Sequence, residues 1–427
     1  MKSNPFKLTV LAAAMATVSG VSMAHDDGLI PGNISEADSA LEAFTGLDPN
    51  DTEFMQSLGL RVGGWVDFGY THNFEDPKNR FNEPPTFNFR TRRVLLNQIN
   101  LFIERAVNTE GDSWDIGGRV DFMYGTDSPF TQAVGLEISD AGKQKWIGNT
   151  NQAHNLNKMA LPQAYLEIYA PVLNGITAKI GHFYTIIGNE VVTAPDNFFY
   201  SHAYTMQYGE PFTHTGALFS MPLVDNLSIT VGAVNGWDSF TADIDDAWNF
   251  LGGLNWDNGV EGAGALSVAL TGIHGTIAGN HGSSDDLTRS LYSIVLWYDI
   301  TDQLHFTLQH DHGWEEQLGT DDDAHWYGIN SYLSYDVNDW FAVGTRMEWF
   351  RDENGVRVGG LYSGQGARGG KSANFYEMTF GVNFTPTKWV KIRPEVRYDW
   401  AENTKPFDDG SQSDQLLFGV DAVVSLF

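Results

Sequence analysis

The chain has 427 residues, a formal net charge of −29, 45 glycines and no cysteine. The absence of cysteine excludes disulfide scaffolds, thiolate metal sites and cysteine nucleophiles. The large acidic excess argues against nucleic acid and anionic lipid surfaces as main partners, because both require a basic face. The aromatic share of 13% and the abundant glycine favour many strands and tight turns over helices.

The first 24 residues have the pattern of a secretory signal peptide. A lysine-containing start precedes the apolar stretch Leu8–Val21, and Ser22-Met23-Ala24 fits a small-residue cleavage site. Residues 25–59 are acidic and irregular, and we expect them to form a periplasmic N-terminal segment. No run of about 18 consecutive apolar residues follows the signal peptide, which excludes a protein built of membrane helices.

From Leu60 onward, apolar and polar residues alternate with a period of two. In the first such run Val62 and Phe68 share one face, and Arg61 and Asp67 share the other. This alternation predicts strands with one apolar and one polar face. Sixteen runs follow the pattern: 60–74, 92–108, 113–126, 161–172, 176–188, 212–224, 227–240, 247–256, 264–279, 287–300, 304–317, 325–337, 340–352, 373–386, 389–402 and 412–427.

The connections between these runs alternate between long and short. Residues 75–91 are followed by the short turn 109–112, and residues 353–372 by the turn at 387–388. This layout is typical of an outer-membrane barrel, which has an even number of strands and long loops at alternate connections. A soluble β-sandwich is not expected to have its long loops at alternate connections. Two gaps of similar length leave the position of one hairpin open in the region 241–286.

We therefore expect an all-β fold over residues 60–427. It is a transmembrane, antiparallel, up-and-down β-barrel of about 16 strands, with short periplasmic turns and long extracellular loops. The terminal Phe427 resembles the sorting signal of bacterial outer-membrane barrels, which ends an amphipathic strand in an aromatic residue. Asp421 and Ser425 interrupt the pattern, so the phase of the last strand stays open. The cleaner apolar set is Phe418, Val420, Ala422, Val424 and Leu426.

The stretch from Leu161 to Trp237 carries the most individual motifs. They are Leu-Pro-Gln-Ala-Tyr-Leu-Glu at 161–167, Lys-Ile-Gly-His-Phe-Tyr at 179–184, Ala-Pro-Asp-Asn-Phe-Phe-Tyr-Ser-His at 194–202, Tyr-Gly-Glu-Pro-Phe-Thr-His-Thr-Gly at 208–216 and Val-Asn-Gly-Trp at 234–237. With these motifs the chain resembles the β-barrel porin-2 (OmpL-like) family of bacterial outer-membrane proteins. The resemblance implies an outer-membrane diffusion channel without specifying a solute. The strand count and layout are also similar to those of the sixteen-stranded general porins, which are usually trimers.

The third long loop, residues 189–211, is the predicted pore constriction. A barrel of about sixteen strands is wide enough for an aqueous channel, whose selectivity depends on what narrows it. In general porins the loop at this position folds into the lumen. So many aromatic side chains would be a liability on an exposed loop, although packing on neighbouring loops or a subunit contact remain alternatives. The predicted constriction residues are Glu190, Asp196, Phe198, Phe199, Tyr200, Tyr204 and Glu210.

Charged residues on the strands are expected to face the lumen, because a charge that faces lipid is costly. A basic wall is predicted on strands that become neighbours when the barrel closes: Arg61, Arg119, Arg346, Arg393 and Arg397. Acidic residues share the same faces: Asp67, Asp121, Glu348, Glu395 and Asp399. An acidic loop opposite a basic wall would create a field across the pore. Plain ion pairing inside a polar lumen explains the same residues, so both interpretations stay open.

The sequence predicts no cofactor and no enzyme activity. No Gly-x-Ser-x-Gly or other nucleophile arrangement is present. His310 and His312 share a face but have no evident third metal ligand. The acidic loops at 321–323 and 408–409 leave a Ca²⁺ site open, although charge runs are usually just solvated.

These observations predict a porin-like channel of the bacterial outer membrane for the passive diffusion of small hydrophilic solutes or ions. The expected partners are outer-membrane lipid and the solutes; nucleic acid is not expected, and a homotrimer stays open. The net acidity suggests a mild preference for cations. A solute-specific channel and a barrel scaffold filled by a partner protein remain alternatives.

Overall fold

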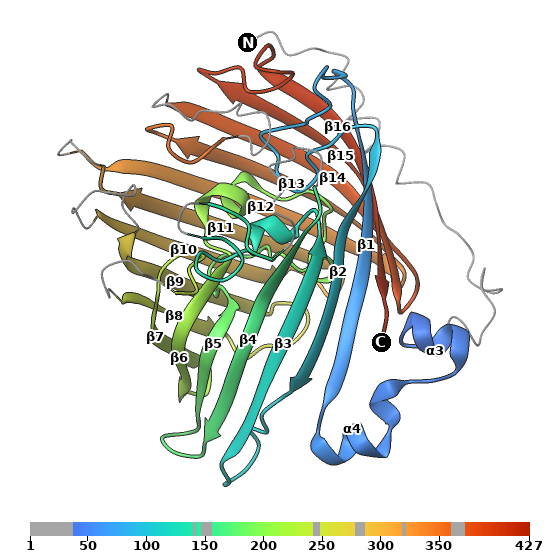
Figure 1. Ribbon diagram of the computed structural model, residues 1–427, viewed down its shortest axis with the longest axis vertical. Helices are drawn as coiled ribbons and strands as arrows, with labels where there is room; N and C mark the ends of the chain where they lie inside the picture. The colour runs from blue at the N-terminus through green and yellow to red at the C-terminus, as the bar shows by residue number, and fades with distance from the viewer. Residues whose placement is uncertain are drawn as a thin grey trace.

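The computed structural model describes residues 37–139, 142–146, 156–241, 248–277, 287–317, 322–359 and 372–427. Within these ranges sixteen antiparallel strands close into a barrel (Figure 1). Each strand pairs with its neighbours in sequence, and β1 pairs with β16 to close the ring. The predicted 16-stranded all-β barrel is therefore confirmed. The predicted signal peptide lies outside the described residues.

Every strand overlaps one of the sixteen alternating runs. The strands are β1 Arg61–Asn73, β2 Arg93–Arg105, β3 Asp115–Gly125, β4 Lys158–Ala170, β5 Ile176–Tyr184, β6 Thr213–Val224, β7 Leu227–Val234, β8 Asn249–Asp257, β9 Leu266–Ile277, β10 Leu287–Asp299, β11 Leu304–Glu315, β12 Ala324–Asn338, β13 Phe341–Asp352, β14 Ala373–Thr387, β15 Val390–Glu402 and β16 Asp414–Ser425.

The period-two pattern determines which side chains point into the barrel. On β1, Asp67 is 1% exposed, whereas the next residue, Phe68, is 47% exposed. On β16, Leu417 and Asp421 are buried, and the even-numbered residues from Phe418 to Val424 are half-buried. The even-numbered set therefore faces outward, which resolves the phase of the last strand.

The connections divide the barrel into two different ends. The six longest connections, 74–92, 126–157, 185–212, 235–248, 353–372 and 403–413, all lie at one end, called here the long-loop end. The opposite end, called the short-turn end, includes the two-residue turns 225–226, 339–340 and 388–389. The hairpin that the sequence left open is formed by β8 and β9, whose turn at 258–265 lies at the short-turn end.

Two short helices precede the barrel at the short-turn end, at the foot of β1 and next to the C-terminus (Figure 1). They are α3, Ala40–Thr45, and α4, Glu53–Leu58, capped by the side chains of Ser39 and Thr52. One-turn segments lie between them and in the long loops: Pro49–Asp51, Ser128–Phe130, Ala194–Asp196 and Thr205–Gly209. None of the helices in the described ranges is long and apolar enough to cross a membrane.

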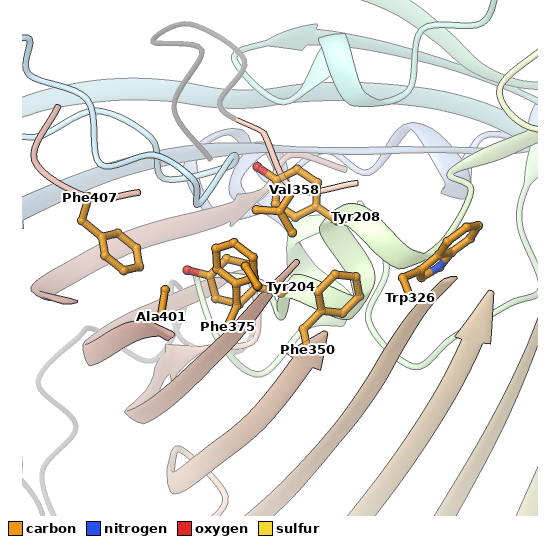
Figure 2. Packing of buried hydrophobic residues seen from close by; sticks show 9 residues of the cluster. Tyr204, Tyr208, Trp326, Phe350, Val358, Phe375, Ala401 and Phe407 are labelled. Atoms are coloured by element: carbon orange, nitrogen blue, oxygen red, sulfur yellow. The ribbon is translucent and has the colours of Figure 1, made fainter. Parts of the chain in front are cut away.

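The largest hydrophobic cluster lies inside the barrel at the long-loop end (Figure 2). Tyr204 and Tyr208 from the loop 189–211 pack there against inward-facing aromatic residues of β12, β13 and β14. The other members of this cluster come from the same strands, from β15 and from two further loops: Trp326, Phe350, Val358, Ala373, Phe375, Ala401 and Phe407. The hydrophobic effect therefore fixes this loop within the barrel rather than above it.

Candidate functional site

Residues 189–211 cross the interior of the barrel. At the start of this loop the indole Nε1 of Trp297, on β10, donates to Asn189 Oδ1 over 2.8 Å. The backbone N–H of Ala194 donates to the Oε1 atom of Gln98, on β2, over 3.1 Å. β2 and β10 are eight strands apart in either direction round the ring, so the loop spans the full width of the barrel.

Arg346, on β13, is the most highly connected link between this loop and the wall. Its side chain is fully buried and pairs with Glu377 through Nε and with Glu190 through Nη1, each over 2.6 Å. The same Nη1 donates to the carbonyl of Ser201 over 2.7 Å. Charge-assisted hydrogen bonds are roughly twice as strong as neutral ones, so one guanidinium ties two points of the loop to the wall.

Arg393 and Arg397, on β15, hold the loop through its backbone. Arg393 Nη1 donates to the carbonyls of Ala194 and Asn197 over 2.7 and 2.8 Å. Arg397 Nη1 donates to the carbonyl of His202 over 2.5 Å. These two arginines and Arg346 are at most 2% exposed. The expectation that the three line an open pore is therefore corrected: they face the lumen, but the loop covers them because its carbonyls satisfy their donors.

The predicted acidic residues on the same strands also bind the loop. Glu395 accepts a hydrogen bond from the N–H of Tyr200 over 3.1 Å, and Glu348 accepts one from the N–H of Tyr204 over 2.5 Å. The hydroxyl of Tyr204 donates to Asp399 Oδ1 over 3.0 Å. Backbone amides of the loop, which would otherwise be buried without partners, are thus satisfied by carboxylates of the wall.

The remaining wall residues lie on β1 and β3, outside these loop contacts. Arg61 pairs with Glu104 over 2.6 Å, and its side chain is 58% exposed. Arg119 pairs with the same glutamate over 2.8 Å and with Asp121 over 2.6 Å, and its side chain is 18% exposed. Asp67 and Asp121 are buried. Of the five predicted basic residues, Arg61 and Arg119 are therefore the two that reach solvent inside the barrel.

Most of the predicted constriction residues are buried within the loop and its contacts. The buried ones are Glu190, Phe199, Tyr200, Tyr204 and Glu210. Asp196 is exposed and Phe198 is half-buried. The loop and the wall are in direct contact, so Glu190 of the loop and Arg346 of the wall meet as an ion pair, as in the second of the two interpretations.

The two loop glutamates have opposite electrostatic surroundings. Burial raises the pKa of the Glu190 carboxyl, but the charge of Arg346 and hydrogen bonding to His202 outweigh it, so the pKa lies below its ordinary value. Burial also raises the pKa of Glu210, and the charge of Asp311 raises it further. Glu190 therefore remains an anion that holds Arg346, whereas Glu210 favours its protonated form.

Glycines on the inner face of the wall leave space for the aromatic residues of the loop. A Cβ atom added at Gly69, on β1, would lie 2.2 Å from the Tyr200 hydroxyl oxygen. One added at Gly344, on β13, would lie 2.6 Å from the Phe198 ring. These approaches are shorter than any normal van der Waals contact, so a side chain at either position would push the loop away.

We expect Gly69→Ala to lower the stability of the barrel, because overpacking a tight core typically costs about 1–3 kcal/mol. Guanidinium unfolding in detergent micelles measures this cost. The matched control is Tyr200→Leu, alone and combined with Gly69→Ala. Leucine removes the Tyr200 ring but not Asn97 Nδ2, which would lie 2.6 Å from the new Cβ, so the combined loss should be smaller than the sum of the two. Additive losses would mean that Gly69 matters for another reason.

Two glutamines that the sequence did not single out complete the attachment. Gln98 accepts from the N–H of Ala194 and donates through Nε2 to Asp127 over 2.8 Å. Gln309, on β11, donates to Glu210 over 2.5 Å. Both stand at inward-facing positions of alternating strands. Their inward-facing positions could have identified them from the sequence. Because they carry no charge, however, they could not be distinguished from other polar residues on the same faces.

Asp127 follows β3 and is buried, and its folded-state pKa is raised to about 8 mainly by that burial. A carboxyl with a raised folded-state pKa lowers stability as pH rises from its unfolded pKa of about 4 towards the folded value. We expect Asp127→Asn to raise the guanidinium unfolding midpoint by an amount that grows from pH 4 to pH 9. A gain that is the same at every pH would contradict this account.

The structure also describes part of the acidic loops. Asp408 accepts a hydrogen bond from the Ser411 hydroxyl over 2.7 Å, and Asp409 accepts one from the amide of Asn79. Asp321 lies outside the described residues. In the part of the chain that the structure describes, no three His, Asp or Glu side chains are grouped so that they could hold a metal ion.

Comparison with known proteins gives one family and a set of similar barrels. The sequence model of the family described as "Putative beta-barrel porin-2, OmpL-like" matches residues 59–426. No curated protein sequence matches the chain significantly.

Three solved structures are similar to this barrel. The anion-selective porin from Comamonas acidovorans has a TM-score of 0.53 and 8% identity, and the match covers 86% of this chain and 99% of that porin. The channel DcaP of Acinetobacter baumannii has a TM-score of 0.54 and 12% identity, with coverages of 86% and 97%. OmpT of Vibrio cholerae, in a trimer form, has a TM-score of 0.51 and 13% identity, with coverages of 86% and 98%. At sequence identities this low, these similarities show a shared fold and nothing about a shared function.

Proposed function

Because the chain belongs to the β-barrel porin-2, OmpL-like, family of outer-membrane porins, we propose that it forms a passive diffusion channel for small hydrophilic solutes or ions. The observation that carries this proposal is a polar inner wall at the short-turn end. Side chains there point inward and are not buried: Arg61, Glu104, Arg119, Glu167, Lys179, Asp257, Asp299, His305 and Lys391. Such a lining suits water and hydrophilic solutes, and its charges set their selection.

We place the constriction at the loop 189–211. Its contacts with β2 and β10 on opposite sides of the ring support this, because solutes must pass beside it. Asp196 and Phe198 lie on the part of the loop that is not buried and would be the residues that solutes meet. The buried members of the predicted set then act as positioning residues.

We also propose a mild cation preference. Arg61, Arg119 and Lys179 lie on β1 to β5, and Asp257 and Asp299 lie on β8 and β10, further round the ring. The basic group is partly neutralised by its own acidic neighbours, as the Arg61–Glu104 pair illustrates. The inward-facing charges named above balance, with four basic and four acidic residues besides His305, so the proposed preference is supported by the net charge of −29.

The proposed orientation is supported by the layout of the barrel, and the proposed assembly by one similar barrel. The short turns would face the periplasm together with residues 25–59, and the long loops would face the cell exterior. The chain would act without catalysis. A homotrimer is supported by the trimer form of the similar OmpT barrel, and it remains part of the proposal.

Single-channel recording in planar bilayers tests the proposal. The refolded, heat-modifiable barrel should give steady ohmic current steps, and a salt gradient should give a reversal potential on the cation-selective side. A correctly folded barrel that passes no current would overturn passive diffusion. A reversal potential on the anion side would overturn only the proposed ion preference.

A further inference from the structure

The N-terminal segment, residues 37–59, presents apolar surface that the barrel leaves uncovered. Phe44, Leu47, Phe54 and Leu58 are 73%, 67%, 67% and 46% exposed. Single exposed apolar side chains are ordinary on protein surfaces, whereas several on one short segment indicate contact with something other than water.

This segment is tied to the two strands that close the barrel. The side chain of Asn50 makes two reciprocal hydrogen bonds with the backbone of Val62, at the start of β1, over 2.8 and 3.2 Å. The N–H of Leu41 donates to the carbonyl of Leu426, just beyond β16, over 3.2 Å. The segment therefore sits on the rim of the short-turn end, at the seam between β1 and β16.

On α4, the exposed apolar side chains of Phe54 and Leu58 lie on one flank. Successive residues of a helix are about 100° apart, so Phe54 and Leu58 lie on the same side as Met55. Met55 is 9% exposed, whereas Gln56, on the other flank, is exposed. In α3, the ring of Phe44 contacts Trp389 edge-on at 5.7 Å and keeps most of its surface free. The apolar stripe thus continues outward from the rim.

The rest of the short-turn end carries a ring of exposed apolar residues. Successive turns and strand ends from β2 to β12 each contribute at least one: Trp114, Leu173, Val224, Val260, Ile300 and Val337. Across the sector from β13 to β1, the large exposed hydrophobic residues at this end of the described chain are Phe427 and the four of the N-terminal segment. The aromatic side chains of Trp340, Phe341 and Phe384 in this sector are half-buried, so the segment adds the more exposed apolar surface there.

We propose that residues 37–59 form an in-plane membrane anchor, whose four exposed apolar side chains insert between lipid headgroups and acyl chains at the short-turn end. The ring of exposed residues marks that boundary, where amphipathic helices bury their apolar face by about 5–10 Å. The five acidic residues of this segment favour zwitterionic over anionic phospholipid. The proposed anchor depends on the barrel fold, and it does not depend on whether the barrel conducts ions.

Because the chain has no cysteine, single-cysteine variants can carry a fluorescent label at one chosen site. We would label Phe44→Cys and Phe54→Cys in vesicles of phosphatidylcholine and phosphatidylethanolamine, with Gln56→Cys as the matched control on the other flank of α4. Heat modifiability confirms that each variant is folded. Labels at 44 and 54 should be quenched by brominated acyl chains and protected from aqueous iodide, and the label at 56 should show the reverse.

Equal iodide quenching at all three sites would overturn the anchor. Protection from iodide without quenching by brominated lipid would also overturn it, because a protein contact would then cover the segment. Phe44→Ser combined with Phe54→Ser should leave the single-channel current unchanged, so failure of the anchor and failure of the channel are distinguishable.

Discussion

Replacement of Arg346 by methionine should release the loop 189–211 and make the channel current larger and noisier. The guanidinium is fully buried between Glu190 and Glu377 and also holds the carbonyl of Ser201. Methionine keeps much of the volume but leaves two buried carboxylates without their partner. Removal of one member of a buried ion pair costs about 3–5 kcal/mol, so the part of the loop at Glu190 and Ser201 should detach from β13, where Glu348 still accepts from the N–H of Tyr204. Single-channel recording and guanidinium unfolding measure the two effects.

Arg61→Met is the matched control, since it removes an arginine that also faces the lumen. Its side chain is 58% exposed and pairs with Glu104 alone among the described salt bridges. Exposed pairs contribute about 0–1 kcal/mol, so this variant should unfold almost as the parent does. A quiet, unchanged current from Arg346→Met in a folded barrel would show that other contacts are enough to hold the loop.

The strands could be predicted because their pattern is local. Each inward-facing polar residue and outward-facing apolar residue is two positions from the next, and a shift of one residue would turn Asp67 and Asp421 toward lipid. The hairpin between β8 and β9 was the weak point, because its turn at 258–265 is about as long as some loops at the other end. The length of a connection therefore does not show which end of the barrel it belongs to in this region.

The roles of the site residues could not be predicted in the same way. Alternation places Arg346 on the inner face, but its partner Glu190 lies 156 residues away in sequence. Nothing local shows that a loop will cover that face. Gln98 and Gln309 carry no charge, and Gly69 acts only through the space that it leaves for Tyr200. The order of the loops along the chain predicted which loop enters the lumen, but the wall residues that this loop contacts are set only when the ring is closed.

Replacement of residues 193–208 by a short Gly-Ser linker should raise the single-channel conductance several-fold. The excised stretch carries the contacts to β2, β13 and β15 and most of the buried loop side chains. Excision also uncovers charges on the wall of both signs: Arg346, Lys391, Arg393 and Arg397, against Glu348, Glu377, Glu395, Asp399 and Asp421. Because these acidic residues are at least as many as the basic ones, the reversal potential should still indicate cation selectivity while the current grows.

A matched shortening of the turn 106–114, at the short-turn end, should leave the current unchanged, because that turn connects β2 and β3 at the rim. If the loop excision leaves conductance unchanged in a folded barrel, the constriction must lie elsewhere. The packed long-loop end is then the place to look. There Tyr208 donates through its hydroxyl to the carbonyls of Pro84 and Gly359, over 2.6 and 2.9 Å, so three separate loops meet at one side chain inside the barrel.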